Sequence, residues 1–307
     1  MTGRVAVFAP SPVLTVTVED HGAGADVHVH AGGQGLWQAR MLQTLGADVV
    51  VVAALVGETG SVVGHLCDDE GVPLLSVRRE GRGAAYVHDR RDGERDELVE
   101  TPGDALSRHD LDELYGLALR AGLESDVTVL SGPSGDDTLP VDVYRRLAAD
   151  LRAVDRVVVA DLAGERLEAV LEGGVDVLKV SDQELLADEL ITESTPEQIV
   201  EAMRDLRLRG ASSVVVTCSD LPTFVLDGPG ARVFEVSVPS MHVVDTRGAG
   251  DSLTAGVAAV LAAGGGLEEA VVTGTAAGAL NVTRHGLGSG DPDAIAALRA
   301  VVSVRDL

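Results

Sequence analysis

The sequence predicts a layered α/β fold in which helices cover both faces of a mostly parallel, doubly wound sheet. Of the 307 residues, 45% are hydrophobic and only 2% are aromatic, so the core is built mainly from Val, Leu and Ala, as in parallel sheets covered by helices. From about residue 108 onward, strand-like runs alternate with helical stretches, which is typical of this fold. We expect one domain spanning residues 1–307.

In the first third of the chain, the sequence predicts alternating strands and helices of the main fold, together with strands of a second, smaller sheet. A strand at 5–9, a helix at 36–45, a buried strand at 49–56 and a helix at about 60–70 follow from the apolar periodicity. Two further stretches, at about 13–30 and 74–100, show the period-two alternation of half-exposed strands. We expect them to pair with each other as a small β-sheet lid inserted in the domain, with the site between lid and body.

In the remaining two thirds of the chain, the sequence predicts a regular alternation of strands and helices. Strands are expected in the runs DVTVLSG, DRVVVAD, DVLKVS and SSVVVTCS, followed by a hairpin in FVLDGPGARVFEV. An apolar strand end at 243–245 then leads into a Gly-Ala-Gly turn and three helices. No repeat or low-complexity segment interrupts this order.

The net charge, the cysteines and the length of the apolar runs disfavour several classes of partner and site. The formal charge of −25 disfavours nucleic acid and anionic membrane surfaces as partners, because both would be repelled. The two cysteines, Cys67 and Cys218, offer neither a disulfide framework nor metal-ligand spacing. The longest aliphatic run, at 49–56, is far too short to span a membrane. We expect a cytoplasmic protein.

The stretch DTRGAGDSLTAG, at 245–256, is the strongest candidate for chemistry. A helix N-terminus presents unpaired N–H groups and a positive dipole end, and glycines let an anion approach closely. Gly248, Ala249 and Gly250 are therefore expected to form an anion hole, with Asp251 kept ionised by the same dipole as a general base. A plain glycine turn before a tightly packed helix explains this stretch about equally well on its own.

Several motifs together resemble the ribokinase-like (PfkB) carbohydrate kinases. DTRGAGDSLTAG resembles their C-terminal signature, and AGGQGLWQARMLQTLG resembles their GGKGxNxARxLxxLG signature; EGVPLL, VLSGP, VLKVSDQE and AAGALNVTRHG extend the resemblance over nearly the whole chain. The chain is most similar to the 1-phosphofructokinase and tagatose-6-phosphate kinase branch. The resemblance implies a Rossmann-like sheet with a β lid often used for dimerisation, with Asp251 as base and Gly248, Ala249, Gly250 and Thr246 around the phosphoryl group.

The acceptor side departs from this branch. Thr15, Gly33, Gln34 and Trp37 occupy the acceptor positions, but Gln34 stands where the branch has Lys, Trp37 where it has Asn, and Thr15 where it has Asp. These changes favour a neutral or aromatic acceptor over a sugar phosphate. Trp37 is expected either to stack on the acceptor or to pack beneath the lid. The lid arginine of the branch falls near 82–83.

The resemblance also implies a nucleotide site and a metal site. It assigns Mg²⁺ to Glu184 and places the nucleotide near the ends of strands and helices in the C-terminal part of the chain. Glu184 corresponds to the Glu of the family's Asn-x-x-Glu motif, with Ser181 in place of Asn. The nucleotide loop lacks both of its glycines and contains Asp220. The remaining candidates for nucleotide contact are Thr217, Ser219, Thr246, Asn281 and Arg247.

We therefore predict an enzyme, a phosphotransferase that uses ATP and Mg²⁺ to phosphorylate a hydroxyl of a sugar or sugar-like small molecule. The resemblance also implies a homodimer formed through the lid. The alternative is a catalytically weak or inactive ligand-binding or regulatory protein on the same fold. A Rossmann oxidoreductase is disfavoured because FAPSP, and no G-x-G-x-x-G, follows the first strand.

Overall fold

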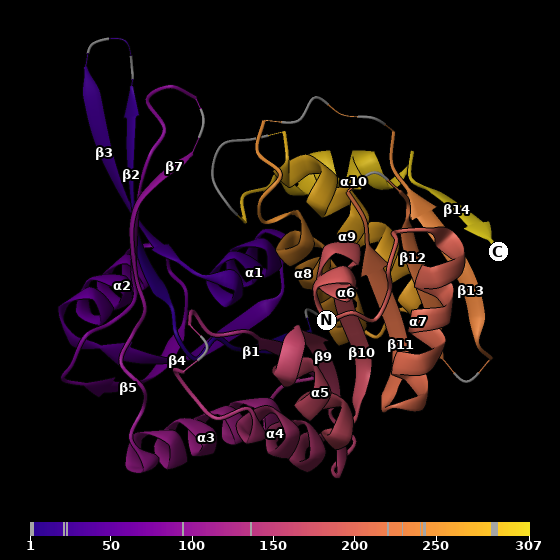
Figure 1. Cartoon of the computed structure of the whole chain (residues 1–307), viewed down its shortest axis with the longest axis horizontal. Coiled ribbons are helices and arrows are strands. Elements are labelled where there is room, and N and C mark those ends of the chain that lie inside the picture. The colour runs from indigo at the N-terminus through magenta and orange to yellow at the C-terminus, as the bar shows by residue number, and fades with distance from the viewer. Residues whose placement is uncertain are drawn as a thin grey trace.

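The computed structural model describes residues 3–20, 22, 24–93, 95–135, 137–219, 221–228, 230–239, 241, 244–283 and 288–307. Over these residues the chain forms one large sheet with helices on both faces and a second, smaller sheet that stands away from the body (Figure 1). The predicted fold class is confirmed.

The large sheet comprises ten strands within the described residues. From one edge to the other they are β14 (Ser303–Asp306), β13 (Arg232–Ser237), β12 (Thr223–Asp227), β11 (Ala211–Thr217), β10 (Val175–Ser181), β9 (Val157–Asp161), β8 (Val127–Ser131), β1 (Arg4–Phe8), β4 (Asp48–Val56) and β5 (Leu74–Arg79). Neighbours from β11 to β5 pair in parallel, whereas β12, β13 and β14 form an antiparallel edge. The strand order reverses at β1.

Helices cover the two faces of this sheet because successive strand residues point to opposite sides. Val5 and Val7 of β1 pack into one core and Ala6 and Phe8 into the other. The first core lies under α1 (Gln34–Thr44), α2 (Gly57–Asp69), α8 (Ala249–Ala262), α9 (Leu267–Asn281) and α10 (Pro292–Arg299). The second lies under α3 (Arg108–Leu123), α4 (Asp142–Arg152), α5 (Gly164–Gly173), the short α6 (Asp182–Ala187) and α7 (Pro196–Leu208).

The smaller sheet has the order β3 (Ala25–Gly32), β2 (Val13–Asp20), β6 (Ala85–Asp89) and β7 (Asp96–Thr101). Its strands project at the upper left of Figure 1. One face carries exposed apolar side chains, since Val27 is 57% and Val29 42% exposed. Dimerisation through this sheet stays a prediction.

Two of the sequence-based assignments are wrong. Residues 74–79 do not pair with the lid strands: β5 joins the large sheet beside β4, because its side chains continue the apolar layer there. The expected strand end before the Gly-Ala-Gly turn is not a strand at Val244 and Asp245, whose N–H groups both donate to the carbonyl of Val282 at 2.7 and 3.2 Å. Val243 lies outside the described residues.

Helices α8 and α9 pack closely because glycines face each other. A side chain at Gly256 would place its Cβ 2.4 Å from the Cα of Gly274. Gly256→Ala is therefore expected to lower the free energy of unfolding by about 1–3 kcal/mol through overpacking. Urea unfolding measures this change.

The matched control is Gly116→Ala, on an exposed position of helix α3 where nothing lies within 4 Å of the new Cβ. That variant should be neutral or more stable by up to about 1 kcal/mol, since Ala is the better helix former. Equal stability of Gly256→Ala and the wild type would contradict the close packing.

No helix among the described residues is long and apolar enough to cross a membrane.

Candidate active site

A large hollow lies at the carboxyl ends of β1 and β8, where the strand order reverses. Open α/β sheets bind ligands at this kind of position. The cavity has a volume of about 560 Å³ and is enclosed by the loops after these strands, the start of α1 and the inner face of the small sheet. The cavity lies where the sequence predicts the site, between the small sheet and the body; its use as the site stays a prediction.

The structure brings the four predicted acceptor residues together, because Thr15, Gly33, Gln34 and Trp37 all line this cavity. Gly33 precedes helix α1 with a φ of 107°, a conformation that favours glycine. Gln34 is fixed at both ends of its amide: its Oε1 accepts from Gly132 N–H at 2.7 Å, and its Nε2 donates to the Asp161 carbonyl at 3.3 Å.

The Gly-Ala-Gly turn forms the start of α8 as predicted. Gly248 has a left-handed φ of 74° and precedes the helix, which begins at Ala249. The first helical N–H bond runs from Ser252 to the Gly248 carbonyl at 2.9 Å. The preceding N–H groups are therefore ones that the helix itself leaves unpaired, and they can bind an anion.

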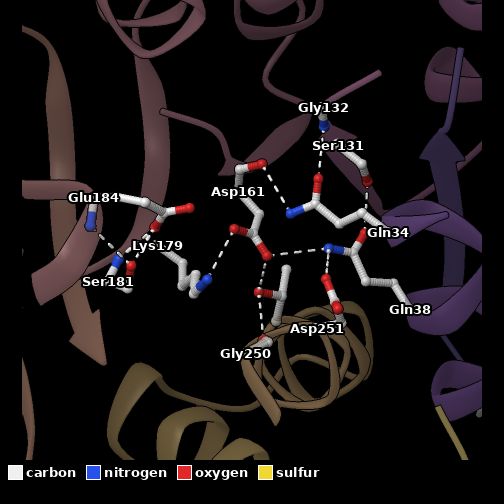
Figure 2. A network of polar contacts seen from close by, with 11 residues as sticks. Gln34, Gln38, Ser131, Gly132, Asp161, Lys179, Ser181, Glu184, Gly250 and Asp251 are labelled. Atoms are coloured by element: carbon white, nitrogen blue, oxygen red, sulfur yellow. Dashed lines mark hydrogen bonds and ion pairs between the residues drawn. The ribbon is translucent and has the colours of Figure 1, made fainter. Parts of the chain in front are cut away.

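Asp251 lies in the first turn of α8 and is 9% exposed. Its Oδ1 accepts a hydrogen bond from Nε2 of Gln38 at 3.4 Å. Gln38 is one turn beyond the cavity-lining Gln34 on α1. Figure 2 shows the Asp251 carboxylate beside the Gln38 amide.

The helix dipole is expected to lower the pKa of Asp251, but other groups around the carboxyl outweigh this effect. Burial and the neighbouring Asp161 raise the pKa of the Asp251 carboxyl above the usual range, although Lys179 acts in the opposite direction. A carboxylate with a raised pKa is the stronger base, which suits proton removal from a hydroxyl.

Behind Asp251 lies a buried ion pair that the sequence did not reveal. Asp161, at the end of β9, accepts from Lys179 Nζ at 3.0 Å through Oδ1 and from Thr254 Oγ1 at 2.7 Å through Oδ2. Burial alone would lower the pKa of Lys179, but Asp161, Glu184 and Asp251 raise it above its usual value. The positive charge is therefore retained.

Lys179 also explains the second glycine of the turn. A Cβ at Gly250 would lie 2.9 Å from Lys179 Nζ. The ammonium group thus lies directly against the start of α8, beside the unpaired N–H groups. Together they form a positively polarised surface next to the buried carboxylates.

Three of the predicted metal and nucleotide residues, Glu184, Thr217 and Ser219, lie at or just after the carboxyl ends of the adjacent strands β10 and β11. Ser181 and Thr217 pair across β10 and β11. Glu184 caps α6, where its Oε2 accepts from the N–H and hydroxyl of Ser181 at 2.6 and 2.7 Å. Ser219 is exposed and accepts from Gln183 Nε2 at 3.2 Å. Asp220 of the same loop lies outside the described residues.

Thr246, Arg247 and Asn281 surround the loop before α8. Thr246 and Arg247 are exposed. Asn281 is buried, and its amide is used structurally: Nδ2 donates to the Arg247 carbonyl at 2.8 Å and Oδ1 accepts from Gly288 N–H at 3.1 Å. Asn281 therefore fixes this loop, and its contact with a nucleotide stays a prediction.

Three arginines supply positive charge to the cavity: Arg247, a candidate from the sequence, and Arg90 and Arg95, which the sequence did not reveal. Arg90, Arg95 and Arg247 line it, and Arg90 and Arg95 both pair with Asp245, at 3.3 and 3.4 Å. Burial and repulsion from Arg247 lower the pKa of Arg95. Arg82, near the position expected for the lid arginine, pairs with Asp104 at 3.5 Å and is absent from the cavity wall as described.

Beside this arginine cluster, defined by Arg90, Arg95 and Arg247, lies a buried histidine. His88 Nε2 is 3.1 Å from Thr17 Oγ1, whereas its Nδ1 is buried with no hydrogen-bond partner among the described residues. Burial and the three arginines lower the pKa of His88 to about 4. The ring is therefore neutral at neutral pH and adds no charge to that of the three arginines.

Comparison with known proteins shows the family to which the chain belongs. The model of the pfkB family carbohydrate kinases matches residues 6–294. An ATP-dependent 6-phosphofructokinase isozyme 2 of Mycobacterium tuberculosis is 30% identical over 293 residues, which cover 90% of this chain and 83% of that protein.

Solved structures show the same fold. Phosphofructokinase-2 from Escherichia coli, in complex with substrates and products, is 25% identical to this chain, with a TM-score of 0.83. The match covers 97% of this chain and 98% of the E. coli chain. Ribokinase from Arabidopsis thaliana, complexed with ribose and ATP, is 24% identical with a TM-score of 0.75 over 97% of this chain and 99% of its own. The chain belongs to the pfkB family of carbohydrate kinases.

Proposed function

We propose that this sugar kinase transfers the γ-phosphoryl group of ATP to a hydroxyl of an acceptor bound in the cavity under the small sheet. The acceptor oxygen forms a bond to the γ-phosphorus, the bond from that phosphorus to the β,γ-bridging oxygen breaks, and ADP leaves with the electron pair. The hydroxyl proton passes to Asp251. The observation that carries the proposal is the position of Asp251 in the first turn of α8, hydrogen-bonded to Gln38, which lies one turn along α1 from the cavity-lining Gln34.

The surroundings of the transferred group support this role. The N–H groups at Gly248, Ala249 and Gly250 are placed to receive negative charge, and Lys179 adds a full positive charge against Gly250. Phosphoryl transfer depends mainly on positioning and electrostatic stabilisation. In this proposal the ends of β10 and β11, with Thr217 and Ser219, hold the nucleotide, and Thr246 lies beside its phosphates.

Mg²⁺ fits this arrangement through Glu184. No cluster of three or more metal-binding side chains occurs among the described residues, but Mg²⁺ bound with substrate phosphates needs only one or two carboxylates and keeps several waters. Glu184 uses Oε2 in its capping bonds, and no hydrogen bond of Oε1 is found within the described chain. When bound, the ion would neutralise phosphate charge.

The arginine cluster supports an acceptor that carries an anionic group, such as a phosphate. Arg90 and Arg95 share the single carboxylate Asp245, and no ion pair of the Arg247 guanidinium is found in the described structure. These guanidinium groups supply the charge that Gln34 lacks. Arg40 and Glu70 of the cavity wall pair with each other at 2.6 Å.

Acidic groups in the same wall limit where the anion can bind. Glu19, Glu97 and Glu100 also line the cavity. An anionic group would therefore lie between Arg95 and Arg247, where the local positive charge is in excess. Guanidinium groups bind phosphate and carboxylate through paired hydrogen bonds.

The test uses Trp37, the only tryptophan, as a reporter in the cavity wall. Neutral sugars, sugar phosphates and nucleosides are titrated with ATP and Mg²⁺ while fluorescence and ADP release are followed together. We expect a sugar phosphate to drive ADP release. In Arg247→Met the KM for this acceptor should rise about tenfold or more, since a charge-assisted hydrogen bond is lost.

Arg82→Met is the matched control, because this exposed arginine follows β5 but lies outside the cavity wall. Its KM should equal that of the wild type. Faster turnover of a neutral sugar, with no effect of Arg247→Met, would contradict the anionic acceptor. Ligand binding with no ADP release across the panel would instead support the inactive binding protein.

A further inference from the structure

Gln38 connects the proposed base to the buried ion pair. Its side chain is fully buried on α1. Nε2 lies 3.1 Å from Asp161 Oδ2 and 3.4 Å from Asp251 Oδ1 (Figure 2). An amide nitrogen carries two N–H groups, so it can donate to both carboxylates at once.

The orientation of the Gln38 amide is fixed by its other end. Ser131 Oγ lies 2.5 Å from Gln38 Oε1, to which it donates. The backbone next to it is held too, since the Tyr144 hydroxyl donates to the Ser131 carbonyl at 2.9 Å. Ionised carboxylates only accept hydrogen bonds, so the nitrogen must face Asp161 and Asp251.

Gln38 acts on Asp251 against the surrounding negative charge. Burial, Asp161 from β9 and Glu184 from α6 raise the pKa of Asp251, whereas Lys179 from β10 and the Gln38 hydrogen bond lower it. Asp161 already accepts hydrogen bonds from Lys179 and Thr254. Gln38 is therefore the neutral group that stabilises the ionised Asp251 directly.

We propose that Gln38 is a positioning residue that fixes one oxygen of Asp251 and favours its ionised form, which leaves the other oxygen to accept the proton of the substrate hydroxyl. No partner of Asp251 Oδ2 is found within the described residues. The inference rests on the proposed role of Asp251 as base. It assigns Gln38 no contact with the substrate.

The test is Gln38→Met, which keeps the length of the side chain but removes both N–H donors. The carboxyl resonance of Asp251, identified by its absence in Asp251→Asn, is titrated by ¹³C NMR. We expect the pKa of Asp251 to rise by about one unit, the size of one hydrogen bond to a charged group. The acid limb of the kcat profile should move to higher pH by the same amount.

Gln34→Met is the matched control, because this glutamine lies on the same face of α1 but its side-chain hydrogen bonds within the described residues go to backbone groups of Gly132 and Asp161. It should leave the Asp251 titration in place. Ser131→Ala, which removes only the hydroxyl that orients the amide, should give a smaller shift in the same direction and provides a second test if Gln38→Met folds poorly.

The two readouts separate this inference from the proposed function. The NMR titration requires no turnover, so a shift in Gln38→Met supports the contact even if no acceptor is found. An unchanged Asp251 titration in both Gln38→Met and Ser131→Ala overturns the inference, whether or not the enzyme turns over. A loss of kcat at every pH with an unmoved acid limb would show that Gln38 acts only in packing.

Discussion

Asp251→Asn is expected to reduce kcat by about a thousandfold, the middle to upper range for a general base. The substituted side chain has the same size, and its carbonyl oxygen can still accept from Gln38, which lies 3.4 Å from Oδ1 in the native protein. The amide cannot take the proton from the acceptor hydroxyl. Steady-state kinetics with the acceptor that the Trp37 titration identifies measures the loss, and calorimetric titration measures ligand affinity, which should be retained.

The control for this variant is Asp293→Asn, which changes an exposed first-turn acid of another helix, α10. It should leave kcat unchanged, because its carboxylate does not face the cavity. Retention of more than a tenth of the kcat by Asp251→Asn would contradict the assignment of Asp251 as base. A parallel loss of ATP or acceptor affinity would indicate that Asp251 acts mainly in binding.

Most of the fold could be predicted because the strands of a parallel sheet are buried on both faces and appear as unbroken apolar runs. The lid could be predicted only in part. The run at 74–79 shows the same alternation as the lid strands, and pairing with β4 depends on tertiary contacts that period alone does not encode.

The candidate site, like the fold, could be predicted from the sequence only in part. Asp251 and the Gly-Ala-Gly turn are contiguous, so a local signature revealed them. Asp161, Lys179 and Gln38 come from three different elements, and their contacts arise only when β9, β10 and α1 are packed together. One signal was available: Lys179 is the only lysine in the chain, and a lone lysine within a buried strand requires a partner.

Because the buried Lys179 and Asp161 each require the other as a partner, we expect the largest loss of stability from a substitution that removes one of them. Lys179 is 7% and Asp161 1% exposed, and the two are 3.0 Å apart. Lys179→Met leaves the Asp161 carboxylate buried without a counter-charge, with Asp251 and Glu184 nearby. The free energy of unfolding should fall by about 3–5 kcal/mol, the usual cost of removing one partner of a buried ion pair. Urea unfolding at neutral pH measures the change.

The double variant Lys179→Met/Asp161→Asn separates charge from packing. Removing both charges should recover at least half of the stability lost in the single variant, since breaking a buried pair costs more than replacing it. Arg145→Met, which breaks an exposed pair with Asp142, should change stability by less than about 1 kcal/mol. If Lys179→Met costs no more than this surface variant, Lys179 does not balance Asp161. If it costs the expected amount, the charge beside the start of α8 is a structural requirement of the fold, in addition to its proposed role in the site.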